Sequence, residues 1–209
     1  MTTAELDARR VELTKLAMDL IAKRGAMIGK SDLAAETRVS RARVDEIFPE
    51  ESDLFDSIVE QWYAHDIEIM EAVIASNLPV QRKFYEFFAR RFARERERYL
   101  EDPGLFALYV ELGSDRFEQV RGYIDLADHY LTELIAQAQD EGYFAGLAIN
   151  RALSLINQMV VCYTSPQMML ILEDRLAEDK LAAIVDTLFA GLSAAERGAA
   201  PVTALRIAE

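Results

Sequence analysis

Residues 30–48 hold the densest group of polar side chains able to recognise another molecule. Guanidinium groups only donate hydrogen bonds and ionised carboxylates only accept them, so a mixture of the two can match a partner that presents both donors and acceptors. The edges of nucleic-acid bases are partners of that kind, whereas phosphates present only acceptors and so suit the cationic side chains alone. The side chains in question are Lys30, Arg38, Ser40, Arg41, Arg43, Asp45 and Glu46.

Signatures of covalent catalysis are missing elsewhere in the sequence. There is no glycine-rich phosphate loop, no HExxH, no GxSxG and no Cys/His nucleophile arrangement. Two histidines and one cysteine leave little beyond scattered carboxylates from which to build an active site. We therefore expect a protein that is not an enzyme and that has no cofactor.

A metal site is the one inorganic alternative that the spacing raises. Asp125, His129 and Glu133 fall on one side of a predicted helix at i, i+4 and i+8 and could offer nitrogen and oxygen ligands. No second histidine lies near them, whereas metal sites built on histidine usually use more than one. We expect ordinary surface residues here and no metal.

The elements that would position the polar group are two short helices joined by a turn, Arg38–Ser40. Ser31 or Asp32 is placed to cap the first helix, Val39 can point inward from the turn, and Ser40 can cap the second helix. Two short helices joined in this way form a helix-turn-helix, which lays its second helix in a DNA major groove. The second helix has an apolar side at spacings of three and four, made of Val44, Ile47 and Phe48.

A helix ending in AKRG, followed by LAAETRVSRARVDEIFPEESDLF, resembles the N-terminal domain of the TetR/AcrR family of bacterial transcriptional regulators. The match covers roughly the first quarter of the chain; beyond it only a helical build and a suitable length agree. The matching residues are Gly25, Leu33, Ala34, Val39, Ser40, Phe48, Pro49 and Leu54. The resemblance implies an all-α protein with a DNA-binding domain over residues 1–49 and a helical ligand-binding and dimerisation domain over residues 50–194.

The sequence departs from the family pattern at four positions. Arg38 stands where the family usually has glycine, so it must accept a strained positive φ or the turn must shift. Asp45, Glu46 and Glu51 are acidic where the family commonly has aromatic, histidine or lysine side chains that touch phosphates. Carboxylates repel phosphates but can accept from cytosine amino groups, so either the base specificity is unusual or DNA binding is weak.

Composition fits a folded helical protein of 209 residues, with 51% hydrophobic residues and five prolines. The net charge is −13, but residues 1–55 hold 9 basic against 11 acidic residues, so most of the acidity lies after them. The single cysteine, Cys162, excludes an intramolecular disulfide. No signal peptide and no long apolar run stand out, so we expect a cytoplasmic protein.

Periodicity and breakers predict about nine helices. Gly25, Pro49, Pro79 and Pro103 mark boundaries, and a break or kink is expected at Ser165-Pro166. Residues 195–209 are expected to form a loosely held tail. After the helix-turn-helix, helices are expected over about 50–75, 80–100, 105–112, 115–140, 147–172 and 178–194.

The resemblance further implies a cavity for a small effector within the fourth to eighth helices. Aromatic rings with a few hydroxyl and amide groups would suit an apolar or aromatic ligand. The alternative is that most of these residues are plain core. The candidate lining residues are Trp62, Phe88, Phe92, Phe106, Tyr109, Tyr123, Tyr130, Asn157 and Tyr163.

In the family, the last two helices pair with their copies to form a homodimer, which also suits two readers on a palindromic operator. The alternative is that their apolar stripes complete the core of one chain. The candidate interface residues are Leu153, Ile156, Val160, Leu181, Ile184, Val185, Leu188 and Phe189.

The expected function is thus a ligand-responsive, dimeric DNA-binding regulator, most simply a repressor released by a small, largely apolar effector. The alternative is a helical small-molecule or protein-binding module of the same fold that has lost or weakened DNA binding. The acidic residues of the second short helix motivate that alternative.

Overall fold

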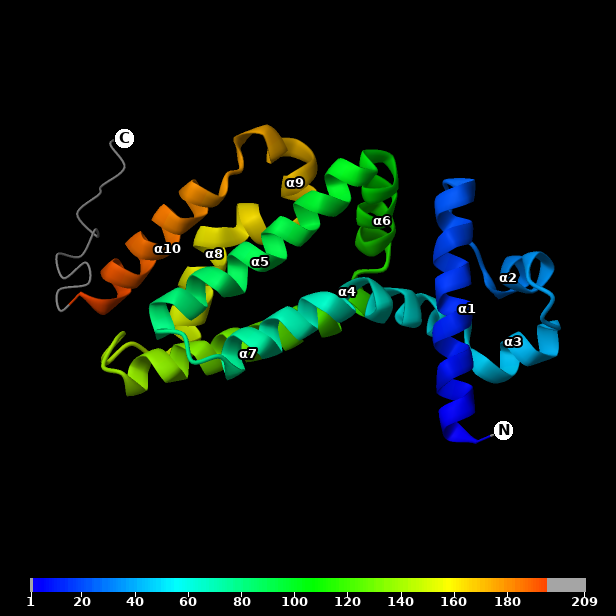
Figure 1. Cartoon of the computed structure of the whole chain (residues 1–209), viewed down its shortest axis with the longest axis horizontal. Helices are drawn as coiled ribbons and strands as arrows, with labels where there is room; N and C mark the ends of the chain where they lie inside the picture. The colour runs from blue at the N-terminus through cyan, green and yellow to red at the C-terminus, as the bar shows by residue number, and fades with distance from the viewer. Residues whose placement is uncertain (1, 195–209) are drawn as a thin grey trace, which may run out of the picture. The chain divides into compact units, whose positions relative to one another are not determined.

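The computed structural model describes residues 2–194 and builds them entirely from helices and connecting loops (Figure 1). The all-α prediction is confirmed, whereas the predicted tail, residues 195–209, lies outside the described residues. The helices are α1 (Thr3–Arg24), α2 (Lys30–Glu36), α3 (Arg41–Ile47), α4 (Glu51–Ala75), α5 (Val80–Glu101), α6 (Pro103–Asp115), α7 (Phe117–Asp140), α8 (Ile149–Thr164), α9 (Pro166–Leu172) and α10 (Glu178–Ser193), with a short 3₁₀ turn over Glu173–Arg175.

Two helix boundaries differ from the predictions for clear reasons. Ser165 is extended, with φ −101° and ψ 117°, and Pro166 lacks an N–H, so the expected kink is a full break that separates α8 from α9. The described residues therefore hold ten α-helices instead of about nine. Helix α6 starts earlier than predicted because the Asp102 side chain accepts from the Leu105 amide at 2.9 Å, while Pro103 occupies the first helical turn.

The described chain divides into two compact units. The first contains residues up to Met70 together with Arg94–Ala127, and the second contains Glu71–Ala93 together with the residues from Asp128 onward. The first unit includes parts of α4 and α6 because their side chains pack on the core that the first three helices share.

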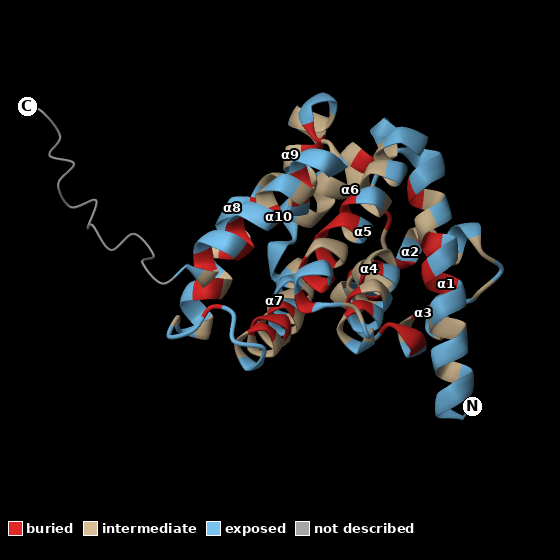
Figure 2. Ribbon diagram, turned by 60° about the vertical axis from the view of Figure 1, so that its left-hand side comes forward, coloured by how far each residue is buried: buried red, intermediate tan, exposed pale blue. Residues whose placement is uncertain are grey.

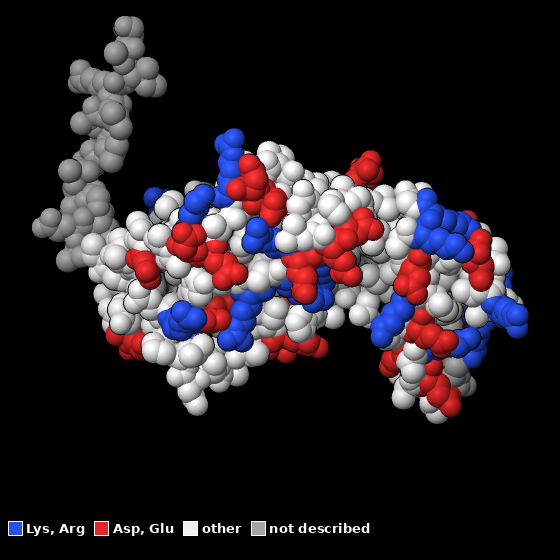
Figure 3. Space-filling view, turned by 45° about the horizontal axis from the view of Figure 1, so that its top comes forward, with Lys and Arg blue, Asp and Glu red and all other residues white. Residues whose placement is uncertain are grey.

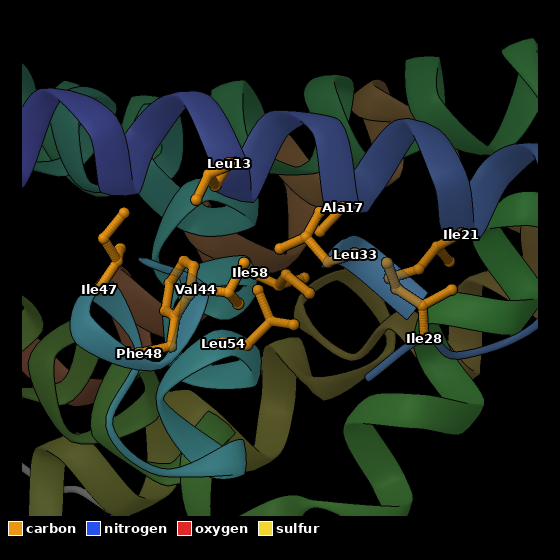
Figure 4. Packing of buried hydrophobic residues seen from close by; sticks show 10 residues of the cluster. All are labelled: Leu13, Ala17, Ile21, Ile28, Leu33, Val44, Ile47, Phe48, Leu54 and Ile58. Atoms are coloured by element: carbon orange, nitrogen blue, oxygen red, sulfur yellow. The ribbon is translucent and has the colours of Figure 1, made fainter. Parts of the chain in front are cut away.

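That shared core of the first unit is apolar and closed (Figure 4). Leu13, Ala17 and Ile21 repeat along one side of α1, as a helix needs to present a stripe to its neighbours. They face Val44 and Phe48 and the other side chains of the cluster, which are Ile28, Leu33, Ile47, Leu54 and Ile58. Removing each large side chain from water stabilises the fold by about 1.5–3 kcal/mol. Helices as short as α2 and α3 are unstable in isolation, so this packing is what holds them.

The second unit has a separate aromatic core. Phe84, Phe144 and Phe189 lie with ring centroids 4.9–5.8 Å apart. Phe144 is the one non-glycine residue with positive φ in residues 2–194, at 52°, and its buried ring holds the loop between α7 and α8 against this core. Figure 2 shows buried positions recurring along α8 beside exposed ones, as expected for a helix with one inward face.

Candidate nucleic-acid interface

Helix α2 begins at Lys30 with Gly29 as its N-cap, earlier than a cap at Ser31 or Asp32 would place it. The Asp32 carboxylate accepts from the Gly29 amide at 3.0 Å, and the Glu51 Oε1 atom accepts from the Lys30 amide at 2.7 Å. A Cβ at residue 29 would lie 2.5 Å from that Glu51 oxygen, so glycine permits the close approach. Glu51, at a position where the family commonly has a side chain that touches phosphate, is therefore engaged in starting α2.

The turn between α2 and α3 is built without left-handed backbone. The Thr37 hydroxyl donates to the Leu33 carbonyl at 2.6 Å, and the Ser40 hydroxyl accepts from the Arg43 amide at 3.3 Å as the N-cap of α3. Ser40 thus caps α3 as predicted, and Val39 packs against the core as predicted. Arg38 is exposed and avoids positive φ, so the turn has shifted and Arg38 carries no such strain.

Lys30 does not lie on the outer surface where it was expected to meet a DNA phosphate. The residue is only 4% exposed, and its ammonium donates to the carbonyls of Phe48 at 2.8 Å and Pro49 at 2.9 Å. These carbonyls close the C-terminal end of α3, where backbone acceptors need donors. The structure corrects the role of Lys30, which fastens the end of α3 to the start of α2.

The two arginines of α3 are paired with acids on the same helix. The Arg41 Nε atom bonds both oxygens of Asp45 at 3.0 Å, and an Arg41 Nη atom donates to the Ser31 hydroxyl. Arg43 lies 2.5 Å from Glu46. The structure thus brings the predicted polar residues of α3 together on one surface, where cations and anions largely compensate one another.

Asp45 is the centre of this network because it also reaches the buried lysine. Its Oδ1 atom lies 3.0 Å from the Lys30 ammonium. Hydrogen bonds from Arg41 and then from Lys30 lower the pKa of the Asp45 carboxyl below the ordinary aspartate value. Asp45 is therefore an ionised acceptor at neutral pH, fixed from two sides.

The surroundings of α3 repeat the same charge balance. Arg24, at the end of α1, pairs with both Asp32 and Glu36 of α2 at 2.7 Å. On the face shown in Figure 3, basic and acidic side chains alternate and no broad basic patch gathers. A surface of this kind supplies little of the general phosphate attraction on which non-specific DNA binding depends.

The ligand candidates of the first unit form an aromatic group around Trp62. Its ring lies 4.3 Å from Tyr109 and 6.5 Å from Phe106, whereas Tyr123 stacks on Tyr63 at 3.7 Å. Burial raises the pKa of the Tyr109 phenol to about 12. These rings pack on one another, so they behave in this structure as core.

Arg98 belongs to this group, although its four-residue spacing from Arg94 and Arg90 on α5 is the pattern of an exposed charged face. Its guanidinium lies 4.3 Å from the Trp62 ring centroid, donates to the Trp62 carbonyl and lies 3.5 Å from the buried carboxylate of Asp66. Arg90, by contrast, is exposed and pairs with Glu86. The aromatic ring that Arg98 contacts belongs to Trp62 on α4. Because Trp62 lies far from Arg98 in the sequence, the spacing of the arginines within α5 gave no indication of this contact.

The remaining ligand candidates lie in the second unit. Phe92 meets Tyr163 at 5.1 Å and Phe88 packs on Phe87 at 5.2 Å. Tyr130 donates to Glu71 and the Asn157 amide donates to Asp128, each at 2.8 Å. The structure therefore divides the predicted ligand residues between the two units, where they contact neighbouring side chains of the same unit.

Most of the predicted dimer-interface residues point into the chain itself. Those buried in the second unit are Ile156, Val160, Leu181, Val185, Leu188 and Phe189; only Leu153 and Ile184 are half-buried. An apolar stripe at helical spacing is satisfied by any apolar partner, and here α8 and α10 satisfy each other. The structure corrects the assignment: the stripes form core, which was the alternative reading.

Potential metal ligands in residues 2–194 do not gather in one place. No group of three or more His, Cys, Asp or Glu side chains there could hold a metal ion, and His129 pairs with Glu133 at 3.1 Å. Over the same residues, no single helix has the length and apolarity needed to cross a membrane; α8 joined to the segment Pro166–Arg175 reaches them only as a pair bent by 52°.

A short helix held by its apolar side, with a polar side outward and a second helix braced across a turn, defines a helix-turn-helix protein. Comparison with protein families matches residues 80–185, 106 of the 209 residues, to the family described as "Tetracyclin repressor-like, C-terminal domain". The chain belongs to this family, the TetR-like transcriptional regulators, which bind DNA and small-molecule effectors and dimerise.

A solved structure extends the likeness to nearly the whole chain. It is the fatty acid degradation regulator FadR from Bacillus halodurans, with a TM-score of 0.56, 17% sequence identity, and coverage of 94% of this chain and 98% of that one. At this identity the likeness concerns the fold alone. A comparison with curated proteins found no match.

Proposed function

We propose that this regulator binds a palindromic operator as a homodimer in the cytoplasm and represses transcription until an effector releases it. The observation that carries the proposal is the placement of α3. Its inner residues Val44 and Ile47 are buried in the core, its N-cap Ser40 is formed, and its other side is open to solvent. A rigid short helix presented in this way fits a major groove.

The proposed effector is small and largely apolar. Support comes from the rings gathered around Trp62 and around Phe92, which an apolar ligand could separate and replace. The response would pass through α4 and α6, because α4 supplies Leu54 to the DNA-binding core and α6 packs Tyr109 on it. Such a ligand must favour one arrangement of these helices over the other, since equal affinity would shift nothing.

In the proposed dimer, the exposed faces of α8 and α10 form the interface, and the buried apolar side chains of the same helices do not. Four exposed α10 residues are small, beside the charged residues Glu178, Asp179, Lys180 and Asp186. A Cβ at Gly191 would meet nothing within 4 Å, so a second helix can approach this part of α10 closely. Met159 and Val161 of α8 are about half exposed, at 52% and 46%. The small exposed residues of α10 are Ala183, Thr187, Ala190 and Gly191.

Selection from random duplexes at low salt tests DNA binding directly. The full chain is expected to enrich a palindromic sequence, with half-sites about one helical turn apart. Arg43→Ala should cost about 1–3 kcal/mol on that sequence if Arg43 reads a base, whereas Arg38→Ala should weaken all sequences alike. Failure of the full chain to enrich any sequence contradicts the proposal.

A second candidate function has its own supporting observation. Both α3 arginines are occupied by Asp45 and Glu46, so a helical module that has lost DNA binding would look much the same. The two candidates separate in the selection above, because the second enriches no sequence at any salt concentration.

A further inference from the structure

The outward side of α3 presents a donor and an acceptor next to each other. Arg41 and Asp45 are four residues apart, about 6 Å along the helix axis, which is less than two base-pair steps of DNA. Val44 and Ile47, on the other side, are buried. Arg41 and Asp45 therefore share the strip of α3 that a base pair would meet.

Asp45 is held more firmly than an exposed aspartate normally is. Lys30 approaches its Oδ1 atom at 3.0 Å, and the lysine is itself fixed by the carbonyls of Phe48 and Pro49. Arg41 approaches both oxygens at 3.0 Å. A carboxylate offers about four acceptor positions, so an oriented position remains for one more donor.

A phosphate cannot be that donor, because it is an anion and presents only acceptors. In the major groove the cytosine N4 amino group is a donor, and guanine beside it offers the O6 and N7 acceptors. An arginine next to an aspartate is thus complementary to a G·C pair: the guanidinium faces guanine and the carboxylate faces cytosine. Adenine also carries an amino donor, but its adjacent N7 acceptor repels a carboxylate.

We infer that Asp45 is a specificity-determining residue that selects cytosine at one position of each operator half-site, with Arg41 on the guanine edge. The inference rests on the proposed function and names the class of base pair that α3 reads. It gives Asp45 a role in base recognition, beside the loss of phosphate contacts that the family pattern suggests.

Selection from random duplexes with the wild-type chain and with Asp45→Asn tests the inference. Asparagine has nearly the same shape but combines a donor with an acceptor, which matches adenine N6 and N7. The preference at one position should therefore change from cytosine to adenine. Glu36→Gln, which removes an acid of α2 also paired with a cation, is the matched control and should leave every base preference unchanged.

A second measurement uses the wild-type chain alone and so does not depend on a variant that folds. Replacing the selected cytosine by 5-methylcytosine keeps the amino group and adds the methyl group that thymine also carries, so binding should stay stronger than with thymine. Replacing it by thymine presents an acceptor to the carboxylate and should weaken binding roughly fivefold or more. Thymine bound as well as cytosine overturns the inference.

The outcomes separate the inference from the proposed function. Enrichment by the wild type with a cytosine-to-adenine change in Asp45→Asn supports both. Enrichment with the same base preference in both proteins overturns the role of Asp45 and leaves operator binding intact. No enrichment by the wild type overturns both.

Discussion

The ammonium of Lys30 lies 3.0 Å from the carboxylate of Asp45, which joins a buried cation of α2 to the outer surface of α3. The same ammonium satisfies the carbonyls that end α3. One lysine therefore fixes both the end of α3 and a side chain on its outer surface, so changes at this position should affect stability and recognition together.

Replacing Lys30 by methionine should destabilise the fold. Methionine keeps an apolar stem but leaves the Phe48 and Pro49 carbonyls without their donor, which we expect to cost about 1–3 kcal/mol. Urea unfolding followed by circular dichroism measures the loss. Lys23→Met, at an exposed position of α1, is the control, and equal stability of the two variants would show that the buried bonds contribute nothing.

The Asp45 carboxyl should titrate below the ordinary aspartate value of 3.8. Because its pKa is lowered in the folded chain, its contribution to stability is present above the unfolded pKa and disappears as the pH falls through the folded pKa. The contribution therefore changes only in acid and is constant around neutrality. Side-chain carboxyl NMR gives the pKa directly, and Arg41→Ala should move it upward; an unchanged value would mean that Arg41 is not the main cause.

Glu46→Gln should increase the affinity for DNA of any sequence. The change removes an exposed anion and releases Arg43 from its 2.5 Å ion pair. One additional phosphate contact makes the slope of log K against log salt more negative by about 0.9. Gel shifts at several salt concentrations measure both quantities, with Glu36→Gln as the control on α2. A slope equal to that of the wild type would indicate that Arg43 does not reach phosphate.

The dimer surface can be tested without disturbing the core. Ala190 is exposed on α10, so Ala190→Arg should leave the fold intact but place a charged side chain in a close helix contact and give monomers by light scattering. Ala72→Arg, at an exposed position of α4, should leave the association unchanged. If Ala190→Arg stays dimeric, the subunits meet elsewhere.

Breakers and caps made most of the helix boundaries predictable from the sequence. Gly25 at φ 64° ends α1, and Ser40 caps α3, as local chemistry requires. Asp102 capped α6 earlier than expected because a proline followed by glycine suggested a break, although proline is well tolerated in a first helical turn.

The sequence carries less information on whether an individual side chain faces the core or the surface. Leu188 lies on an apolar stripe that an interface or a core would satisfy equally, and only the folded chain shows that it faces inward. Lysine is seldom buried, and no residue near Lys30 in the sequence indicated that its ammonium would donate to two backbone carbonyls. In both cases the deciding partners are distant in the sequence, where spacing within one helix carries no information.

Trp62 is the chain's one tryptophan, and it lies against the guanidinium of Arg98 and the ring of Tyr109. Its indole emission will therefore come from a single, well-defined environment. Any compound that separates these three side chains should change the wavelength or the intensity of the tryptophan fluorescence. The unlabelled protein therefore provides an optical assay for screening compounds.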